Sequence, residues 1–279
     1  MNEVDRLKSY RDKTVEFCSK LDYSSTILEQ EFTNNTHDIY FAYPLLFIDV
    51  FPSAKFDPGF LEKLSIAGFL LYRSVIIQDR LTDNDDYEKV SRLGVPFLSN
   101  TLDYCRQIAI GILKELFPPK SEFWSFLEAS KECHIMATQY EKTLHSITDA
   151  YKCISLFDNL SYFKAYYGRL SIDALFCHYI EDLDVVHYVE ACFQHDEGIT
   201  LYKQFAFLLQ IVDDIDDINK DFLSGQANIA IKLTQILFPD CGDLQGLKKH
   251  FYFSGVAPCL FSKICSNADI ITKGANDKF

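Results

Sequence analysis

The feature that most constrains this chain is the absence of proline over a long stretch. After Pro118 and Pro119 the next proline is Pro239, and only three glycines interrupt the residues between them. Proline ends or kinks a helix, so its absence leaves room for several long helices. Apolar residues recur in this stretch at spacings of three and four, as in Leu201, Phe205, Leu208, Leu209 and Val212. The pattern predicts an all-α protein.

Turn signals divide the chain without marking a linker. Short segments with proline or glycine stand at 51–53, 57–59, 118–119 and 239–240, and none is long enough to join two domains. Because 48% of the 279 residues are apolar, the chain can bury a large core. We therefore predict one helical domain over residues 1–279, with a polar tail at 266–279 that can fray.

Charge and cysteine content exclude several classes of protein. Forty acidic residues against 27 Lys and Arg give a net charge of −13, and no basic patch stands out in the sequence, so nucleic acid is not an expected partner. The N-terminus does not have the pattern of a secretory signal, and no apolar run is long enough for a transmembrane segment. Nine dispersed cysteines without a Cys-x-x-Cys pair indicate free thiols. We expect a cytoplasmic protein.

The most specific segment is an aspartate-rich run that follows an apolar helical stretch. Five of the nine residues from 213 to 221 are aspartate, and Asp213, Asp217 and Asp221 are spaced by four. On one helix these three side chains would form a carboxylate row with a step of about 6 Å per turn. The repulsion within such a row favours a bound cation, and oxygen ligands favour Mg²⁺ or Ca²⁺ over zinc.

A second acidic segment follows the apolar stretch that ends near Ile77. Asp79 and Asp83 are again four apart, and Asp85 and Asp86 come shortly after. Taken alone, such a segment at a helix end is as often a solvated surface as a binding site. If the two segments face each other across a bundle, their carboxylates can hold a group of Mg²⁺ ions that binds a diphosphate.

These two segments resemble the metal-binding motifs of the class I isoprenoid synthases, which include terpene cyclases, trans-prenyltransferases, and squalene and phytoene synthases. Asp79-Arg-Leu-Thr-Asp83 is similar to the first family motif, Asp-Asp-x-x-Asp, with Arg80 at its second position. The same residues also fit the Asp-x-x-x-Asp form of squalene and phytoene synthases. The resemblance covers residues 60–235 in organisation and is carried by the two acidic motifs.

The later segment is similar to three subfamily signatures. Gln210, followed by Asp213, Asp214 and Asp217, resembles the prenyltransferase pattern Gln-x-x-Asp-Asp-x-x-Asp. Asp213, Asp217 and Asp221 resemble the three metal-binding positions of terpene cyclases. Asp217 and Asp221, followed by Gly225 and Asn228, resemble the second Asp-x-x-x-Asp of squalene and phytoene synthases. All three signatures place metal at Asp213 or Asp217.

The resemblance implies a single antiparallel helical bundle with a central active-site cavity. It also implies a cluster of three Mg²⁺ ions that holds the diphosphate of an allylic substrate. The implied metal ligands are Asp79, Asp83, Asp213, Asp217 and Asp221. The implied function is a terpene synthase that ionises a C15 or C20 prenyl diphosphate and releases diphosphate. Many members of these families are dimers, so a homodimer is a further expectation.

Three other residues are implied to contact the diphosphate. Arg169 lies in the segment 161–173, at a fitting separation between the two motifs, and its guanidinium offers a planar pair of donors to phosphate oxygens. With the motif aspartates it is expected to act in the ionisation. Lys220 and Gln210 stand beside the second motif. Arg169 could instead pair with Asp173, which follows it by four residues.

Three alternative functions use some of the same residues. Prenyl transfer, of the squalene and phytoene synthase type or of the chain-elongating type, would use both acidic motifs. A His-Asp metal phosphohydrolase would use His195-Asp196 or His37-Asp38, but it needs further His and Asp ligands. A helical protein that binds divalent metal without catalysis is the third, because Arg80 could replace one Mg²⁺ in the first motif.

Overall fold

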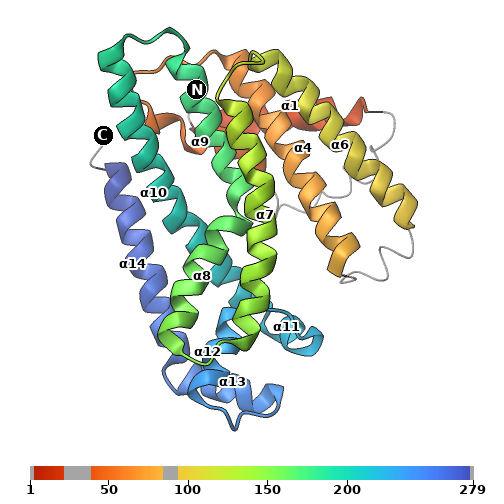
Figure 1. Cartoon of the computed structure of the whole chain (residues 1–279), viewed down its shortest axis with the longest axis vertical. Coiled ribbons are helices and arrows are strands. Elements are labelled where there is room, and N and C mark those ends of the chain that lie inside the picture. The colour runs from red at the N-terminus through yellow and green to blue at the C-terminus, as the bar shows by residue number, and fades with distance from the viewer. Residues whose placement is uncertain (1–2, 22–38, 84–93, 277–279) are drawn as a thin grey trace. The chain divides into compact units, whose positions relative to one another are not determined.

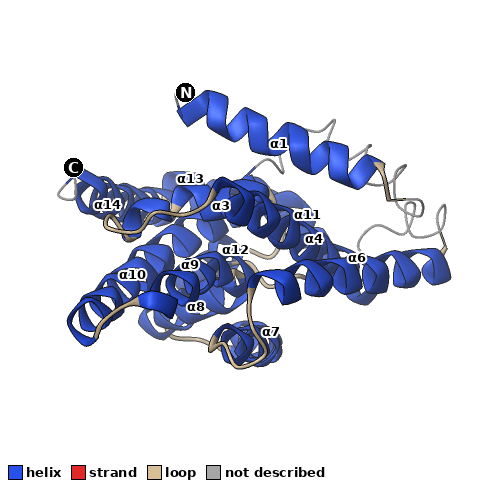
Figure 2. Cartoon of the chain, turned by 90° about the horizontal axis from the view of Figure 1, so that it is seen from above, coloured by secondary structure: helices blue, strands red, loops and turns tan. Residues whose placement is uncertain are grey.

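The structure is a computed structural model that describes residues 3–21, 39–83 and 94–276 (Figure 1). All regular structure in these ranges is helical, and no strand occurs in them (Figure 2). The predicted all-α class is therefore confirmed. Within the same ranges, no helix combines the length and the apolar composition that crossing a bilayer requires.

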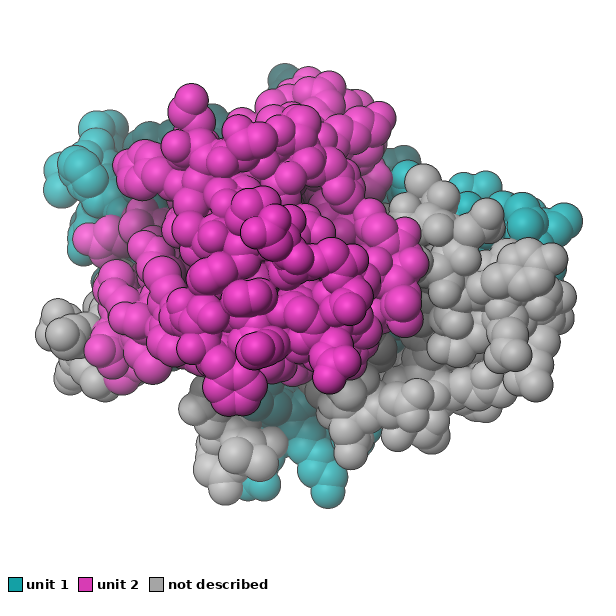
Figure 3. Space-filling model, turned by 90° about the horizontal axis from the view of Figure 1, so that it is seen from below, with its two compact units in different colours: residues 1–127, 167–196 teal, residues 128–166, 197–279 magenta. Residues whose placement is uncertain are grey.

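Contacts divide the chain into two compact units, which are coloured separately in Figure 3. Unit 1 comprises residues 1–127 and 167–196, and unit 2 comprises residues 128–166 and 197–279. Two of the three boundaries fall within α7 (Phe123–Ser146) and α10 (Val185–Asp216), so both helices contribute to both units, and the third follows Tyr166, the first residue of α9 (Tyr166–Tyr179). A single domain stays a prediction.

Unit 1 is built on two long helices that pack side by side, α4 (Pro58–Asp83) and α6 (Val95–Leu116) (Figure 1). α4 begins at a sequence turn because proline is favoured at the first helical position and Asp57 caps the helix. Asp57 Oδ2 accepts a hydrogen bond from Phe60 N at 3.0 Å. The unit also contains α1 (Glu3–Ser19), α3 (Ile39–Leu46), α9 (Tyr166–Tyr179) and 3₁₀ turns at Ile48–Val50 and Ile180–Asp182.

Unit 2 packs its helices around one apolar core. Phe157 and Phe207 meet edge to face in this core, with ring centroids 5.6 Å apart. Side chains of Asp149, Asn228 and Asp243 cap the first turns of three of the helices. Besides parts of α7 and α10, the unit contains α8 (Ala150–Lys164), α11 (Ile218–Ser224), α12 (Ile229–Leu237), α13 (Leu244–Phe253) and α14 (Val256–Asn276).

The C-terminal segment is more regular than its polar sequence indicated. Residues 266–276, expected to belong to a tail that can fray, continue α14, and 277–279 lie outside the described residues. Leu260, Ile264 and Asn267 recur at three and four, and all three pack inward. The buried face of α14 therefore continues into the polar segment, because Asn267 is buried at a position where an apolar residue is usual.

Candidate functional site

The aspartate-rich segment spans a break between two helices of unit 2. α10 ends at Asp216, Asp217 is the turn residue between the helices with φ −90° and ψ 7°, and α11 begins at Ile218. Asp217 N donates to Asp213 O, and Asp221 N donates to Asp217 O, both at 2.9 Å. The three aspartates of the predicted row keep a helical hydrogen-bond pattern, but they lie on two helices and the intervening turn instead of one continuous helix.

Asp213 and Asp217 are the members of the row that reach solvent. Asp213 is exposed, and the side chain of Asp217 is 46% exposed. The surrounding protein removes part of the hydration of Asp213, and this loss, together with the Asp217 carboxylate, raises the pKa of Asp213. Lys220 Nζ lies 3.9 Å from Asp217 Oδ2. A divalent cation beside these two carboxylates would relieve their repulsion.

Asp214 and Asp221 are buried and bonded to neighbouring groups. Asp214 Oδ1 accepts from Gln210 Nε2 at 2.8 Å, and its Oδ2 accepts from Ile229 N at 2.6 Å. Asn228 Nδ2 donates to Asp221 Oδ2 at 2.8 Å and to the backbone oxygen of Asp214 at 2.6 Å. These bonds fasten the start of α12 to the end of α10. Gln210 and Asp221, which the resemblance assigns to diphosphate and metal, therefore hold protein partners here.

Burial controls the titration of both inner aspartates. Burial raises the pKa of Asp214 to about 7, although the bonds from Ile229 N and Gln210 and the nearby Lys164 act in the opposite direction. Burial likewise raises the pKa of Asp221, against the bond from Asn228. The break between α10 and α11 is thus stabilised by a carboxyl group that is easily protonated.

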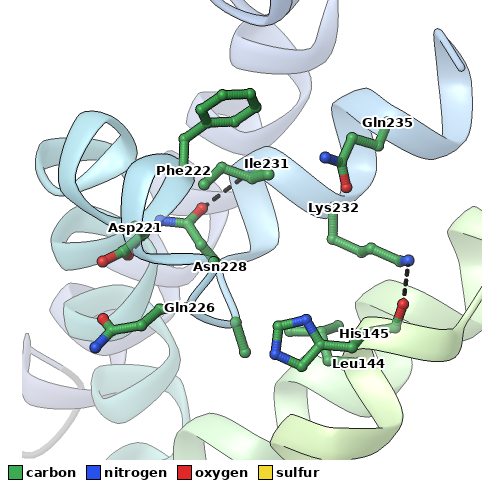
Figure 4. A pocket seen from close by; sticks show the side chains of 11 residues that line it. Leu144, His145, Asp221, Phe222, Gln226, Asn228, Ile231, Lys232 and Gln235 are labelled. Atoms are coloured by element: carbon green, nitrogen blue, oxygen red, sulfur yellow. Dashed lines mark hydrogen bonds between the residues drawn. The ribbon is translucent and has the colours of Figure 1, made fainter. Parts of the chain in front are cut away.

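The connection from α11 to α12 depends on Gly225 and Asn228. Gly225 ends α11 with φ +73°, a left-handed conformation that glycine adopts without strain. Asn228 Oδ1 then accepts from Ile231 N at 3.1 Å and caps α12, as the dashed line in Figure 4 shows. One buried asparagine thus caps a helix and bonds to the acidic segment.

We expect Asn228→Ala to lower the free energy of unfolding by about 2–3 kcal/mol, because it removes a helix cap and one donor to a buried carboxylate. Urea unfolding of the variant and of the wild type measures this difference. Asp149→Ala is the matched control: it removes the exposed cap of α8 and should cost only about 1 kcal/mol. Equal losses in the two variants would show that Asn228 acts as a cap alone.

Lys164 is a cation near the acidic segment that no sequence motif marked. Its Nζ lies 2.7 Å from Glu141 Oε1. Burial alone would lower the pKa of Lys164, but the carboxylates of Glu141, Asp214 and Asp213 outweigh it and raise this pKa. Lys164 stands within the segment 161–173, yet no spacing rule connects it with residues about 50 positions later on another helix.

Arg169 lies in α9 of unit 1 and forms an ion pair with Asp173. The spacing of four residues between them had indicated this pair as the alternative to diphosphate binding. Arg169 Nε lies 3.2 Å from Asp173 Oδ2, and its guanidinium carbon lies 5.9 Å from the ring centre of Phe126. The fully buried Asp173 also contacts His195, with Oδ1 and Nε2 2.8 Å apart. His195 is buried and Asp196 is exposed, and the His-Asp alternative stays a prediction.

Asp79 and Asp83 lie in the last turns of α4 in unit 1, on a helix as their spacing predicted. Their side chains, and all of Asp85, Asp86 and His37-Asp38, lie outside the described residues. The meeting of the two acidic motifs across a bundle therefore stays a prediction.

In the described parts of the chain, no three His, Cys, Asp or Glu side chains lie close enough together to hold one metal ion. Asp221 Oδ2 already accepts from Asn228, and Asp213 and Asp217 are the more exposed carboxylates of the row. Two carboxylates fit Mg²⁺, because this ion commonly binds one or two protein carboxylates and takes its other ligands from water and substrate phosphates. The donor set thus suits an ion that arrives with a phosphorylated substrate.

A pocket of about 280 Å³ lies beside the acidic segment in unit 2 (Figure 4). Of the predicted metal ligands, Asp221 lines it, and neither Asp213 nor Asp217 does. Lys232 Nζ donates to the backbone oxygen of His145 at 2.6 Å on one side of the pocket. This pocket is a neighbour of the acidic segment, and the expected central cavity stays a prediction.

No protein-family model and no curated protein sequence matches the chain. The resemblance to class I isoprenoid synthases therefore rests on the two acidic motifs and on the helical fold that carries them.

Proposed function

We propose that the protein is a Mg²⁺-dependent class I terpene synthase that ionises an allylic prenyl diphosphate of C15 or C20 length. The observation that carries this proposal is the pair Asp213 and Asp217. These carboxylates reach solvent one helical turn apart, at a helix break that buried hydrogen bonds hold in place. The all-α fold and the position of Asp79 and Asp83 on α4 also support it.

Ionisation of an allylic diphosphate separates a delocalised carbocation from an anionic leaving group. Asp213 and Asp217, with Asp79 and Asp83, would hold the Mg²⁺ ions, which neutralise the diphosphate when bound. Lys220 adds positive charge close to Asp217. An isoprenoid synthase bundle with a central cavity completes the proposal, since aromatic walls exclude water and stabilise the cation.

The described cations differ in how they can serve the diphosphate. Lys164 contacts Glu141, and its ammonium group places a positive charge near Asp213 and Asp214 within unit 2. Arg169 is paired with Asp173 through Nε, and a guanidinium has further N–H groups that can donate to a diphosphate. In this proposal Arg169 and the lysines contribute together.

Prenyl transfer is the second candidate function, and Gln210 favours it. Gln210 bonds to Asp214, so two positions of the prenyltransferase pattern Gln-x-x-Asp-Asp-x-x-Asp lie side by side on α10. Prenyl transfer needs isopentenyl diphosphate or a second allylic substrate, whereas a terpene synthase acts on one allylic diphosphate alone.

Thermal melting with Mg²⁺ and inorganic diphosphate tests whether the proposed site assembles. We expect the two together, at about 100 times their dissociation constant, to raise the melting temperature by about 5 °C, and either one alone to raise it much less. The joint effect should disappear in Asp213→Ala and persist in Asp216→Ala, which removes an exposed carboxylate of the same segment. No joint stabilisation of the wild type would rule out a metal–diphosphate site.

A further inference from the structure

One segment of this acidic protein is positively charged. Residues 244–268, which form α13 and the first half of α14, contain three lysines and no Asp or Glu, whereas the whole chain has a net charge of −13. The lysines are Lys248, Lys249 and Lys263. The sequence showed no concentrated basic patch because the segment contains only three lysines. Its net positive charge arises because it contains no Asp or Glu.

The corner between α13 and α14 presents two aromatic side chains to solvent. Phe253 is 86% exposed and Tyr252 is 44% exposed. Their neighbours Leu247, Phe251 and Val256 are buried and fix both sides of the corner to the core of unit 2. The two aromatic rings are therefore held outside that core by a fixed piece of backbone.

The lysines and the aromatic residues share one surface of α13. Lys248 precedes Tyr252 by four residues, and Lys249 precedes Phe253 by four, so each lysine lies one helical turn behind an aromatic ring. α13 ends at Phe253, and Gly255, with φ +98°, turns the chain into α14. The aromatic pair thus stands at the tip of the helix, with positive charge directly behind it.

The helix that carries these residues, α13, lies at the end of unit 2 (Figure 1). In Figure 1, α13 lies beyond α12 at the lower end of the helices of this unit, and Figure 3 looks onto that end. Exposed aromatic rings at a helix tip can enter the boundary between lipid headgroups and acyl chains, and the lysines behind them can meet anionic headgroups. Lysines next to exposed aromatic rings match both the anionic headgroups and the apolar boundary of a lipid bilayer.

We propose that the tip of α13, formed by Lys248, Lys249, Tyr252 and Phe253, is a peripheral docking surface for anionic lipid bilayers. The aromatic rings enter the interface, and the lysines bind the phosphates of the headgroups. The rest of the chain, which is acidic, is repelled from the same surface, so docking also fixes which end of unit 2 faces the lipid. This binding does not depend on the proposed catalysis.

Co-sedimentation of the purified full chain with vesicles tests the docking surface. One set of vesicles is phosphatidylcholine, and the other is phosphatidylcholine mixed with phosphatidylglycerol. We expect the wild type to bind the mixed vesicles at low salt and to release them as ionic strength rises. Replacing both lysines (Lys248→Gln with Lys249→Gln) should weaken binding about 20-fold, and Phe253→Ser about tenfold.

Phe193→Ser is the matched control, because Phe193 is also exposed, at 67%, but stands on unit 1 beside Glu190 and Glu197. It should bind the mixed vesicles as the wild type does, and all variants should melt close to the wild-type temperature because none of the changed side chains is buried. The proposal is overturned if the wild type binds neither vesicle, if it binds both equally, or if Phe193→Ser weakens binding as much as Phe253→Ser.

Discussion

Asp213→Ala and Asp217→Ala are each expected to lower prenyl diphosphate turnover by about 100-fold or more, equivalent to about 2.7 kcal/mol of transition-state stabilisation. Each substitution removes a carboxylate that would hold Mg²⁺ against the leaving diphosphate. The ligand-free fold should survive, because Asp213 is exposed and its removal relieves repulsion of Asp217. Asp79→Ala should have the same effect on turnover. Diphosphate release and thermal melting, measured on the same preparations, check both halves of this expectation.

Asp216→Ala separates metal binding from a general loss of negative charge. Asp216 is exposed at the end of α10 but lies outside the row spaced by four. Its removal changes the net charge by the same amount as Asp213→Ala, and the variant should keep most of its turnover. Equal losses in both variants, or a large drop in the ligand-free melting temperature of Asp213→Ala, would contradict the assigned role of Asp213.

The second large effect concerns stability and pH. Burial raises the pKa of Asp214 in the folded protein to about 7, above the ordinary value of 3.8. Between these two pH values the folded protein keeps a proton that the unfolded chain has lost, so the free energy of unfolding falls as pH rises through this window. A shift of about three units corresponds to roughly 4 kcal/mol. The stabilisation is fully present below about pH 4 and absent above about pH 7.

Asp214→Asn should remove this contribution. Asparagine has the same size, can still accept from Ile229 N, and carries no charge at any pH. Urea unfolding from pH 4 to pH 8 should therefore show a free-energy difference between wild type and variant that changes across the window. Asp216→Asn, at an exposed position, should follow the wild-type profile. Parallel profiles for the wild type and Asp214→Asn would contradict the raised pKa.

The helical fold could be read from the sequence because its causes are local. The stretch without proline and the apolar spacing of three and four predict long helices between Pro119 and Pro239, where the structure has α7 to α12, without any knowledge of their packing. The C-terminal segment was harder, because Asn267 occupies a buried position that a count of apolar residues misses.

The candidate site could be predicted only in part. Spacing identified Asp213 and Asp217, but a continuous helix was assumed through Asp217, where the structure has a break. The reason for this break lies in bonds from Asn228 and Ile229, which are 14 and 15 residues from Asp214. Such contacts depend on how the chain turns after α11, and no periodicity in the sequence encodes them.

The cations illustrate the same limit. The pairing of Arg169 with Asp173 follows from their spacing of four, but the contact of Asp173 with His195, 22 residues away on α10, does not. The position of Lys164 near the acidic segment likewise requires α8 and α10 to pack together. Spacing rules describe one helix at a time, whereas these charges are arranged by packing between helices.

Incubation of the purified protein with Mg²⁺ and separate C10, C15 and C20 allylic diphosphates tests the proposed function most directly. Each reaction is run with and without isopentenyl diphosphate and followed by hydrocarbon analysis and diphosphate release. We expect a cyclic or rearranged hydrocarbon from the C15 or C20 substrate alone, with diphosphate release that requires Mg²⁺. A longer diphosphate formed only with isopentenyl diphosphate, or no diphosphate release from any substrate, would contradict the assignment as a terpene synthase.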